Sequence, residues 1–316
     1  MAEGPLLLSC VGVATDGALL PHFLDHYRAL GVDPADMHLI LNASGPEAAA
    51  LEAAVGTLRA FGCPAPEIWT DPYTSGAMWE RRRALQDRVA PPGRWVLSAD
   101  VDEYHEYPEP LGPFLARCAA MGVDCVQGVF VDRLAPGGKL GPVAPAPGVL
   151  AQFPVIADVG RAIGGRGAHH DLAGTVKVMA MRGHVRPSRG GHHPVPGQRA
   201  RHLYRHPLAQ FPAMATPAGR FAVPTWVHHV HWTDSLPARL RTRLATPGVS
   251  PAGGEYGRKQ LAHLERHGGI DPALLDPGPG AIPPGWEGRL ARLRREGAAR
   301  AALAALRRAA GRMLGR

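Results

Sequence analysis

A pair of carboxylates at the end of an apolar run has the clearest chemistry in this sequence. Asp100 and Asp102 follow the run 94–99, which predicts a short buried strand. Two residues apart on an extended chain, their side chains point to the same side. Such a pair can hold a hard divalent cation against the phosphates of a ligand. An acidic turn after a strand is the plainer interpretation, so other segments have to decide between the two.

Histidines form a second cluster. The chain contains 16 histidines, and residues 228–232 (His-His-Val-His-Trp) are the densest group. On a strand, His229 and His231 would share one face. Their imidazoles could then complete the coordination of a cation held by Asp100 and Asp102. The alternative is a polar strand edge with satisfied histidines.

Two further histidine-bearing segments are weaker signals. Residues 190–193 (Gly-Gly-His-His) place His193 in a loop whose glycines let the backbone approach a ligand closely. A flexible surface turn is the alternative. Residues 169–171 (His-His-Asp) bring Asp171 beside histidines, and a His/Asp pair can act as a general base.

Basic side chains precede and follow the carboxylates. Arg81, Arg82 and Arg83 lie on an expected helix, where at most one or two of them can face one site. Arginine can form paired hydrogen bonds with phosphate oxygens, but three in a row are also typical of a solvated face. Lys177 lies in the middle of an apolar strand and needs an anionic partner or exposure, so it is a candidate diphosphate contact.

The first hundred residues alternate between strand and helix patterns. Apolar runs predict strands at 6–13, 37–41, 67–69 and 94–99, and helical spacing predicts helices at 20–30, from 44–47 to near Gly62, and at 75–89. Asp16 is placed to cap the first helix. This order predicts an α/β fold with a mostly parallel sheet flanked by helices. Ligands of such sheets bind at the carboxyl ends of the strands, where Thr15, Asp16 and Asn42 also fall.

The second half of the chain is less regular. Strands are expected at 123–131, followed by Asp132, and at 175–181 and 225–232. Residues 134–150 are expected to form a loop. Residues 245–285 are rich in proline and glycine and are expected to wrap the surface.

Composition limits the class of protein. The chain has 316 residues, of which 45% are hydrophobic and 20% charged, enough for one large α/β domain or two small ones. Its four cysteines are scattered and without Cys-x-x-Cys spacing, which indicates reduced core residues and a reducing cytoplasm. We see no signal peptide pattern and no apolar run long enough to cross a bilayer.

Positive charge is concentrated at the C-terminus. The net charge is +8, and residues 286–316 hold nine Arg and two Glu, which gives 9 − 2 = +7. The tail predicts two helical pieces broken near Gly297, with one apolar stripe that contains Leu303, Leu306, Ala310 and Met313. A basic amphipathic helix can lie on an anionic membrane, which would give peripheral contact through residues 286–316. A helix docked on the domain is the alternative. We therefore divide the chain into domains 1–285 and 286–316.

Taken together, these blocks resemble a bacterial family 2-type glycosyltransferase of the GT-A fold, in the branch with an Asp-Val-Asp-Glu-(Phe/Tyr) box after a Trp-bearing strand. Here the box is 100–104, after Trp95. The resemblance covers roughly residues 5–245 and includes the segments 23–32, 127–134, 152–154, Lys177, 190–193 and 229–232, in the family's order. The sequence also departs from the pattern. Thr15-Asp16 stands where Asn-Glu is usual, His231 replaces a lysine, and the family's Glu-Asp box is not evident.

The resemblance implies transfer of a sugar from a nucleotide-diphosphate sugar to an acceptor hydroxyl or amine, with inversion. A bound Mn²⁺ or Mg²⁺ would neutralise the departing diphosphate. Asp132 is the first candidate for the catalytic base and Asp171 the second. The residues expected to bind the metal are Asp100, Asp102, His229 and His231, and those expected to bind the donor are Thr15, Asp16, Asn42, Arg83, Asp100, Lys177 and His193.

Two alternatives remain open at this point. One is a non-catalytic binding protein with a GT-A-like fold, and the other is a metal-dependent phosphohydrolase. A phosphatase with an Asp-x-Asp box carries it after the first strand, whereas here it follows the fourth, which argues against the phosphatase. The expected location is the cytoplasm, with a peripheral place at the inner membrane face as the alternative, and no specific nucleic-acid partner is expected. The sugar, the nucleotide base and the acceptor are not encoded in any motif that we recognise.

Overall fold

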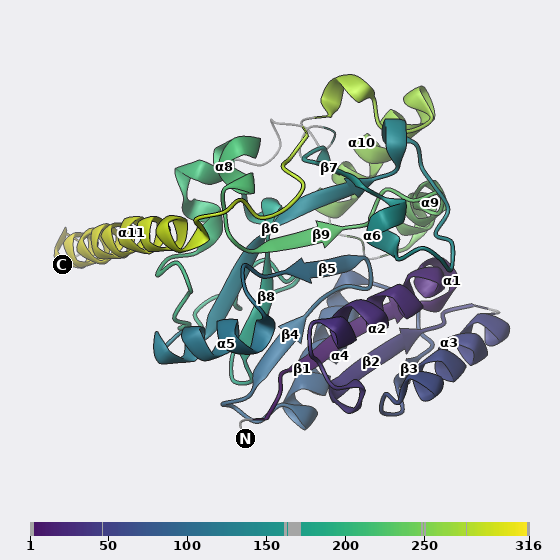
Figure 1. Ribbon diagram of the computed structural model, residues 1–316, viewed down its shortest axis with the longest axis horizontal. Coiled ribbons are helices and arrows are strands. Elements are labelled where there is room, and N and C mark those ends of the chain that lie inside the picture. The colour runs from purple at the N-terminus through teal and green to yellow at the C-terminus, as the bar shows by residue number, and fades with distance from the viewer. Residues whose placement is uncertain are drawn as a thin grey trace.

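The computed structural model describes residues 3–45, 47–160, 163, 172–247, 249, 251–275 and 277–314. Their centre is a curled sheet in the order β3-β2-β1-β4-β8-β6-β9-β5, with β7 paired to β6, and helices lie against it (Figure 1). The α/β class predicted from the sequence is confirmed. The strands are β1 Leu6–Gly12, β2 Met37–Asn42, β3 Glu67–Trp69, β4 Trp95–Ser98, β5 Glu103–Glu106, β6 Cys125–Leu134, β7 Val155–Ala157, β8 Val176–Arg182 and β9 Trp226–His229.

The helices cover both faces of the sheet's first half. They are α1 Val13–Asp16, α2 Leu20–Ala29, α3 Ala48–Phe61, α4 Ser75–Val89, α5 Leu111–Ala120, α6 Val149–Gln152, α8 Pro217–Phe221, α9 Leu236–Ala245, α10 Pro251–His267 and α11 Trp286–Leu314. Leu7 of β1 packs in one apolar cluster with residues of α2 and α3, whereas Leu6 and Leu8 pack in another with residues of α4. Successive side chains of β1 therefore enter opposite layers, as expected for a strand buried on both faces.

Strands β3, β2, β1 and β4 are parallel, as the alternating pattern predicts. Strand β8 then runs antiparallel to both β4 and β6, β9 is parallel to β6, and β5 is antiparallel to β9. Backbones approach closely where β6 meets β9. A Cβ atom on Gly128 would lie 2.2 Å from the Met179 sulfur and 2.8 Å from the Thr225 carbonyl oxygen.

The acidic box does not simply end a strand. The chain turns at Val101 and Asp102, with Glu103 N donating to Asp100 O at 2.9 Å, and continues as β5. The expected strand end is thus a tight turn between two strands. Glu103 and His105 are buried in β5, and the sequence analysis missed this element because its residues are mostly polar.

Three local predictions were wrong. Asp16 caps no helix; its carboxylate accepts from Thr15 and Arg239 instead. Residues 245–285 do not merely wrap the surface, because they contain α10, in which Gly257 lies close to Leu240 and Leu244 of α9. The tail is one continuous helix. A Cβ at Gly297 would lie 1.8 Å from the Tyr204 carbonyl oxygen, so this glycine permits close packing and does not break α11.

Helix α11 projects from the rest of the molecule toward the C-terminus (Figure 1). None of the described helices is long and apolar enough to cross a membrane. Cys10, Cys118 and Cys125 are buried free thiols, as the sequence predicts, and Cys63 is half-buried.

Candidate metal centre

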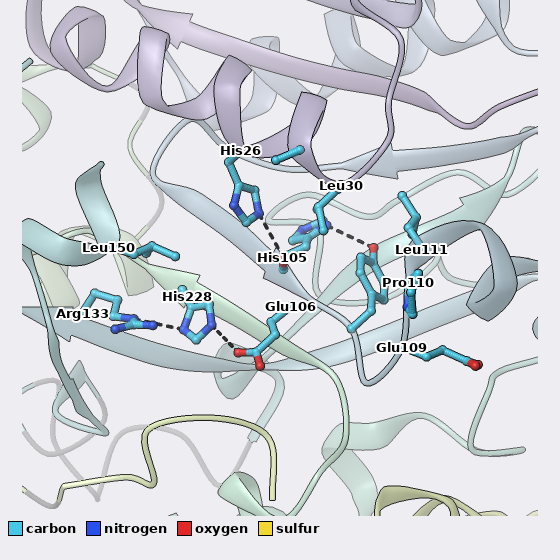
Figure 2. Close-up of a pocket in the computed structure, with 12 residues that line it drawn as sticks. His26, Leu30, His105, Glu106, Glu109, Pro110, Leu111, Arg133, Leu150 and His228 are labelled. Carbon is cyan, nitrogen blue, oxygen red and sulfur yellow. Dashed lines mark hydrogen bonds and ion pairs between the residues drawn. The ribbon is translucent and has the colours of Figure 1, made fainter. Parts of the chain in front are cut away.

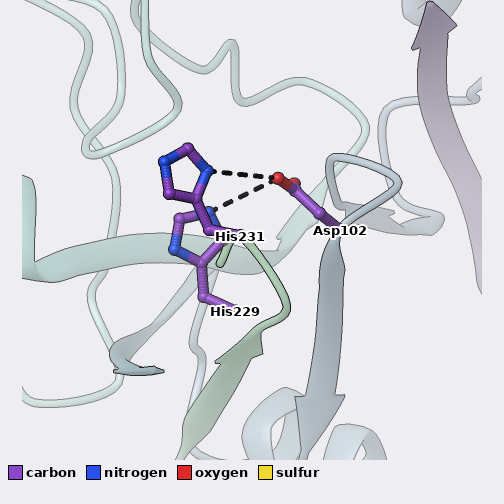
Figure 3. Close-up of side chains that lie close together, drawn as sticks. All are labelled: Asp102, His229 and His231. Atoms are coloured by element: carbon purple, nitrogen blue, oxygen red, sulfur yellow. Dashed lines mark ion pairs between the residues drawn. The ribbon is translucent and has the colours of Figure 1, made fainter. Parts of the chain in front are cut away.

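Three potential metal ligands converge where β4, β5 and β9 meet. Asp102 lies in the turn before β5, His229 ends β9, and His231 lies two residues further along (Figure 3). Antiparallel pairing sets Glu103 opposite His229, and Val230 N donates to Asp102 O at 2.8 Å. The register of β5 on β9 therefore brings the carboxylate and the two imidazoles together.

The spacing of these ligand atoms suits one cation. Asp102 Oδ2 lies 3.6 Å from His229 Nε2 and 3.7 Å from His231 Nδ1, and one ligand atom from each residue lies within 4.8 Å of the others. Neighbouring ligands around an ion bound at about 2.1 Å are about 3 to 3.4 Å apart, so small movements would close the shell. The two rings stack with centroids 4.8 Å apart and an interplanar angle of 17°, which confirms that His229 and His231 share one side.

Protonation of the cluster is set by its buried charges. Burial lowers the pKa of His229, but the carboxylates of Asp102 and Asp132 outweigh this effect and raise that pKa to about 10. Burial lowers the pKa of His231 to about 4, so this imidazole is neutral and can offer a lone pair. Its Nε2 is buried without a hydrogen-bond partner. A cation that enters the cluster would displace the proton of His229.

Asp100 belongs to a separate ion-pair network. Its carboxylate accepts from Arg82 at 2.5 Å and from Lys177 at 2.7 Å, and Lys177 also pairs with Glu103 at 2.7 Å. Burial raises the pKa of Asp100, but the Lys177 and Arg82 charges outweigh it and lower that pKa to about 2. Burial and repulsion by Asp100 raise the pKa of Glu103 to about 7. The structure therefore groups Asp102, and not Asp100, with the two histidines.

Asp132 lies next to the cluster, at 3.8 Å from His229 Nδ1. Its carboxylate accepts N–H hydrogen bonds from Val159, Gly160 and the Trp232 indole. Burial raises its pKa, but His229 and these donors lower it overall. A carboxylate held in this way is a weak base, and it orients His229 and the 159–160 turn.

Arg239 of α9 connects the cluster to the end of the first strand. It donates to Asp16 at 2.8 Å and to the His231 carbonyl at 2.9 Å, and it lies 3.7 Å from Asp102. Thr15 in turn donates to Asp16. Thr15 and Asp16 are thus placed at the same edge as the candidate metal ligands, as the topology predicts.

The other residues predicted to bind the sugar donor contact backbone carbonyl groups of this chain. Asn42 donates to the carbonyls of Trp69 and Asp71, and Arg83 donates to Pro187 O. His193 Nδ1 lies 2.8 Å from Pro194 O. Asp171, together with His169 and His170, lies outside the described residues.

Arg82, Glu103 and Arg239 are site residues that the sequence analysis did not select. The sequence could have indicated Arg82, because an arginine in a helix just before a carboxylate-bearing strand can point inward and pair with the carboxylate. It is almost completely buried and also donates to Leu8 O, Ser98 Oγ and Ala99 O. Arg239 lies far from the acidic box in the sequence, and no motif around it indicates a role in the site.

A cavity of about 450 Å³ lies elsewhere, between α2, β5, α5 and the far side of β9. His228 lines it, because it alternates with His229 along β9 and points the other way. Figure 2 shows His228 between Arg133 and Glu106; its Nε2 lies 2.6 Å from Glu106 and its Nδ1 accepts from Arg133 Nε at 3.1 Å. His228 therefore belongs to this cavity and not to the candidate metal cluster, and His105 Nε2, which also lines the cavity, has no hydrogen-bond partner among the described residues.

Known proteins resemble this chain only distantly. The chain matches no family model and no curated protein. Among solved structures, it is similar to the crystal structure of S. aureus TarS residues 1–349, with 9% identity, a TM-score of 0.32, and coverage of 84% of this chain and 74% of that one. For a second S. aureus TarS structure the identity is 10%, the TM-score 0.32 and the coverage 86% and 44%. A likeness at this level identifies neither a family nor an activity.

Proposed function

We propose that this protein is a metal-dependent glycosyltransferase that moves a sugar from a nucleotide-diphosphate sugar to an acceptor hydroxyl or amine with inversion. The observation that carries the proposal is the convergence of Asp102, His229 and His231 at the strand edge where an α/β sheet binds ligands. The order of sequence blocks around the acidic box supports the same reaction class.

The donor atoms favour one of the two expected cations. One carboxylate oxygen and two imidazole nitrogens form a mixed set, whereas Mg²⁺ prefers oxygen ligands throughout. We therefore expect Mn²⁺ to bind more tightly than Mg²⁺. A bound cation would act as a Lewis acid toward the leaving diphosphate.

The surrounding residues position this site. Arg239 holds Asp16 and the His231 backbone in place. Lys177 and Arg82 fix Asp100, and through it the turn that carries Asp102. A small shift of Lys177 from Asp100 toward an incoming diphosphate would exchange one anionic partner for another, because Arg82 still pairs with Asp100.

The catalytic base stays a prediction. Asp132 is adjacent to the cluster, but its contacts with Val159, Gly160 and Trp232 make it a poor proton acceptor. An Asp132→Asn variant separates the roles. A base would show a loss of kcat with unchanged donor affinity, whereas an orienting residue would show weaker metal binding.

Thermal unfolding tests the function directly. The protein is titrated with UDP-, GDP-, dTDP- and CDP-sugars, each with and without Mn²⁺, and the midpoint is recorded, because ligands of the native state raise it. We expect a Mn²⁺-dependent rise for one nucleotide class, followed by release of nucleoside diphosphate when acceptors are added. His231→Gln should abolish the metal-dependent part.

His267→Gln is the matched control, since His267 is exposed on α10 and lies outside the cluster. It should behave as the parent protein. Donor binding without turnover across acceptors would favour a nucleotide-sugar binding protein. An absence of any metal-dependent shift, or one retained by His231→Gln, would refute the proposed site.

A further inference from the structure

Helix α11 has two faces of different character. Its first half packs on the domain through Leu290, Leu293 and Gly297. The opposite side is exposed along its length, and we call it the outer stripe. It consists of Arg292, Arg295, Ala299, Ala302, Leu303, Leu306 and Ala310. Spacings of three and four residues keep these positions on one helical face.

The outer stripe ends in exposed leucines. Leu303 is 49% and Leu306 68% exposed, on the part of α11 that extends away from the domain (Figure 1). A helix without tertiary contacts is marginal in water, and in proteins most helical stability comes from packing an apolar face. Large apolar side chains on such a helix therefore indicate a surface that receives them.

The charge of this region indicates what that surface is. After Glu296 the sequence has five arginines (Arg300, Arg307, Arg308, Arg312, Arg316) and no acidic residue. Arg300 pairs with Glu296 at 2.9 Å, and Arg307 and Arg308 are exposed. A second copy of the same helix would bring like charges together, whereas an anionic surface would complement them.

A basic cavity lies at the base of α11. It has a volume of about 490 Å³, and its lining contains four arginines (Arg117, Arg205, Arg294 and Arg295) against one acidic residue, Glu287. Arg205 has a φ of 61°, which is uncommon for a residue other than glycine. Arg295 belongs to both the cavity and the outer stripe, so the two features are contiguous.

We propose that α11 docks this protein on an anionic lipid bilayer. Leu303 and Leu306 enter the headgroup–acyl boundary, Arg292 and Arg295 bind lipid phosphates, and the arginine cavity receives a headgroup. The domain then lies on the side of α11 that faces away from the bilayer. This inference is independent of the reaction proposed above.

Vesicle flotation with the full chain tests the proposal. Vesicles contain phosphatidylcholine alone or with 30% phosphatidylglycerol, at about 50 mM or 500 mM NaCl. We expect binding only to the anionic vesicles, weakened at high salt. Leu303→Ser/Leu306→Ser should lower the partition coefficient at least about tenfold, with Ala305→Ser, an exposed position off the stripe, as the matched control.

A pair of arginine variants separates the effect of position on the outer stripe from the effect of net charge. Arg295→Gln should lower partitioning about fivefold, as expected for one basic residue at an anionic surface, whereas Arg308→Gln, off the stripe, should lower it less. Equal losses for these two variants would overturn the docking geometry. Failure to float with anionic vesicles, leucine-dependent dimers in sedimentation, or salt-sensitive binding to duplex RNA in place of vesicles would overturn the proposal itself.

Discussion

Lys177→Met probes the buried ion network beside the candidate metal centre. Lys177 is 3% exposed and pairs at 2.7 Å with both Asp100 and Glu103, the latter 2% exposed. Removing one partner of a buried pair typically costs about 3–5 kcal/mol. Arg82 still compensates Asp100 in the variant, so most of the cost falls on Glu103.

Protonation of Glu103 limits the loss of stability that Lys177→Met can cause. Burial, Asp100 and the other charges already raise the pKa of Glu103 from 4.5 to about 7, with Lys177 present. Placing a proton at pH 8 on a group whose pKa is about 7 costs about 1.4 kcal/mol, so this is the most that the loss of the Glu103 pair can cost. Without Lys177 the pKa of Glu103 rises further, so the side chain can take up a proton instead of remaining as an unpaired anion. Together with the partly compensated loss at Asp100, we expect a loss of about 2 kcal/mol at pH 8.

The sign of the pH dependence follows from the raised pKa. A carboxyl whose folded pKa lies above its unfolded pKa binds more protons in the native state, so its stability contribution is lost as pH rises. The difference between Lys177→Met and the parent protein should therefore be smaller at pH 5.5 than at pH 8. Urea unfolding at both pH values, followed by tryptophan fluorescence and linear extrapolation, measures it.

Two further variants sharpen this test. Lys177→Met/Glu103→Gln should recover up to about 1.4 kcal/mol of the loss, since the unpaired anion is gone. Arg81→Met is the exposed counterpart, because Arg81 pairs with Glu67 and Asp71 near the surface, and it should cost less than about 1 kcal/mol. A Lys177→Met loss below about 1 kcal/mol at pH 8, or one that Glu103→Gln leaves unchanged, would refute the reasoning.

Two other outcomes concern packing and pH. Gly128→Ala should lower the free energy of unfolding by about 3 kcal/mol, because its Cβ would meet Met179 and the Thr225 backbone; Gly56→Ala, with open space in α3, should be neutral or stabilising by up to about 1 kcal/mol in the same urea assay. Burial lowers the pKa of His26 and of His202 to about 4. Below about pH 6.5 the unfolded chain therefore binds protons on these two histidines that the folded protein does not. The free energy of unfolding then falls toward pH 4, by about 1.4 kcal/mol per histidine and pH unit. His26→Gln/His202→Gln should flatten that decline in a pH series of thermal midpoints, and an unchanged slope would contradict it.

The first half of the fold was predictable because its signals are local. Apolar runs and helical spacing within short windows define β1, β2, β3, β4 and α4, and the predicted helix 75–89 coincides with Ser75–Val89. The predicted alternation along 228–231 was also correct, since it depends only on the period of a strand. His229 and His231 face one way and His228 faces the other.

The remaining features depend on contacts between distant segments. Residues 103–106 are mostly polar and become β5 only because β9 supplies its ladder partners. Gly297 looks like a helix breaker until the Tyr204 carbonyl is found against it. Likewise, the partners of Asp100 could not be ranked from spacing, because the choice between Arg82 and Arg83 is decided by which one reaches the buried side of α4.

The pairing of β5 with β9 also has a consequence for the order of folding. Asp102 is synthesised early, whereas His229 and His231 emerge only after β6 and β8, so the ligand cluster is a contact of high sequence separation. Such contacts form late, since the intervening loop must close first. A nascent or truncated chain that ends before β9 therefore carries the whole acidic box and yet lacks two of the three candidate metal ligands.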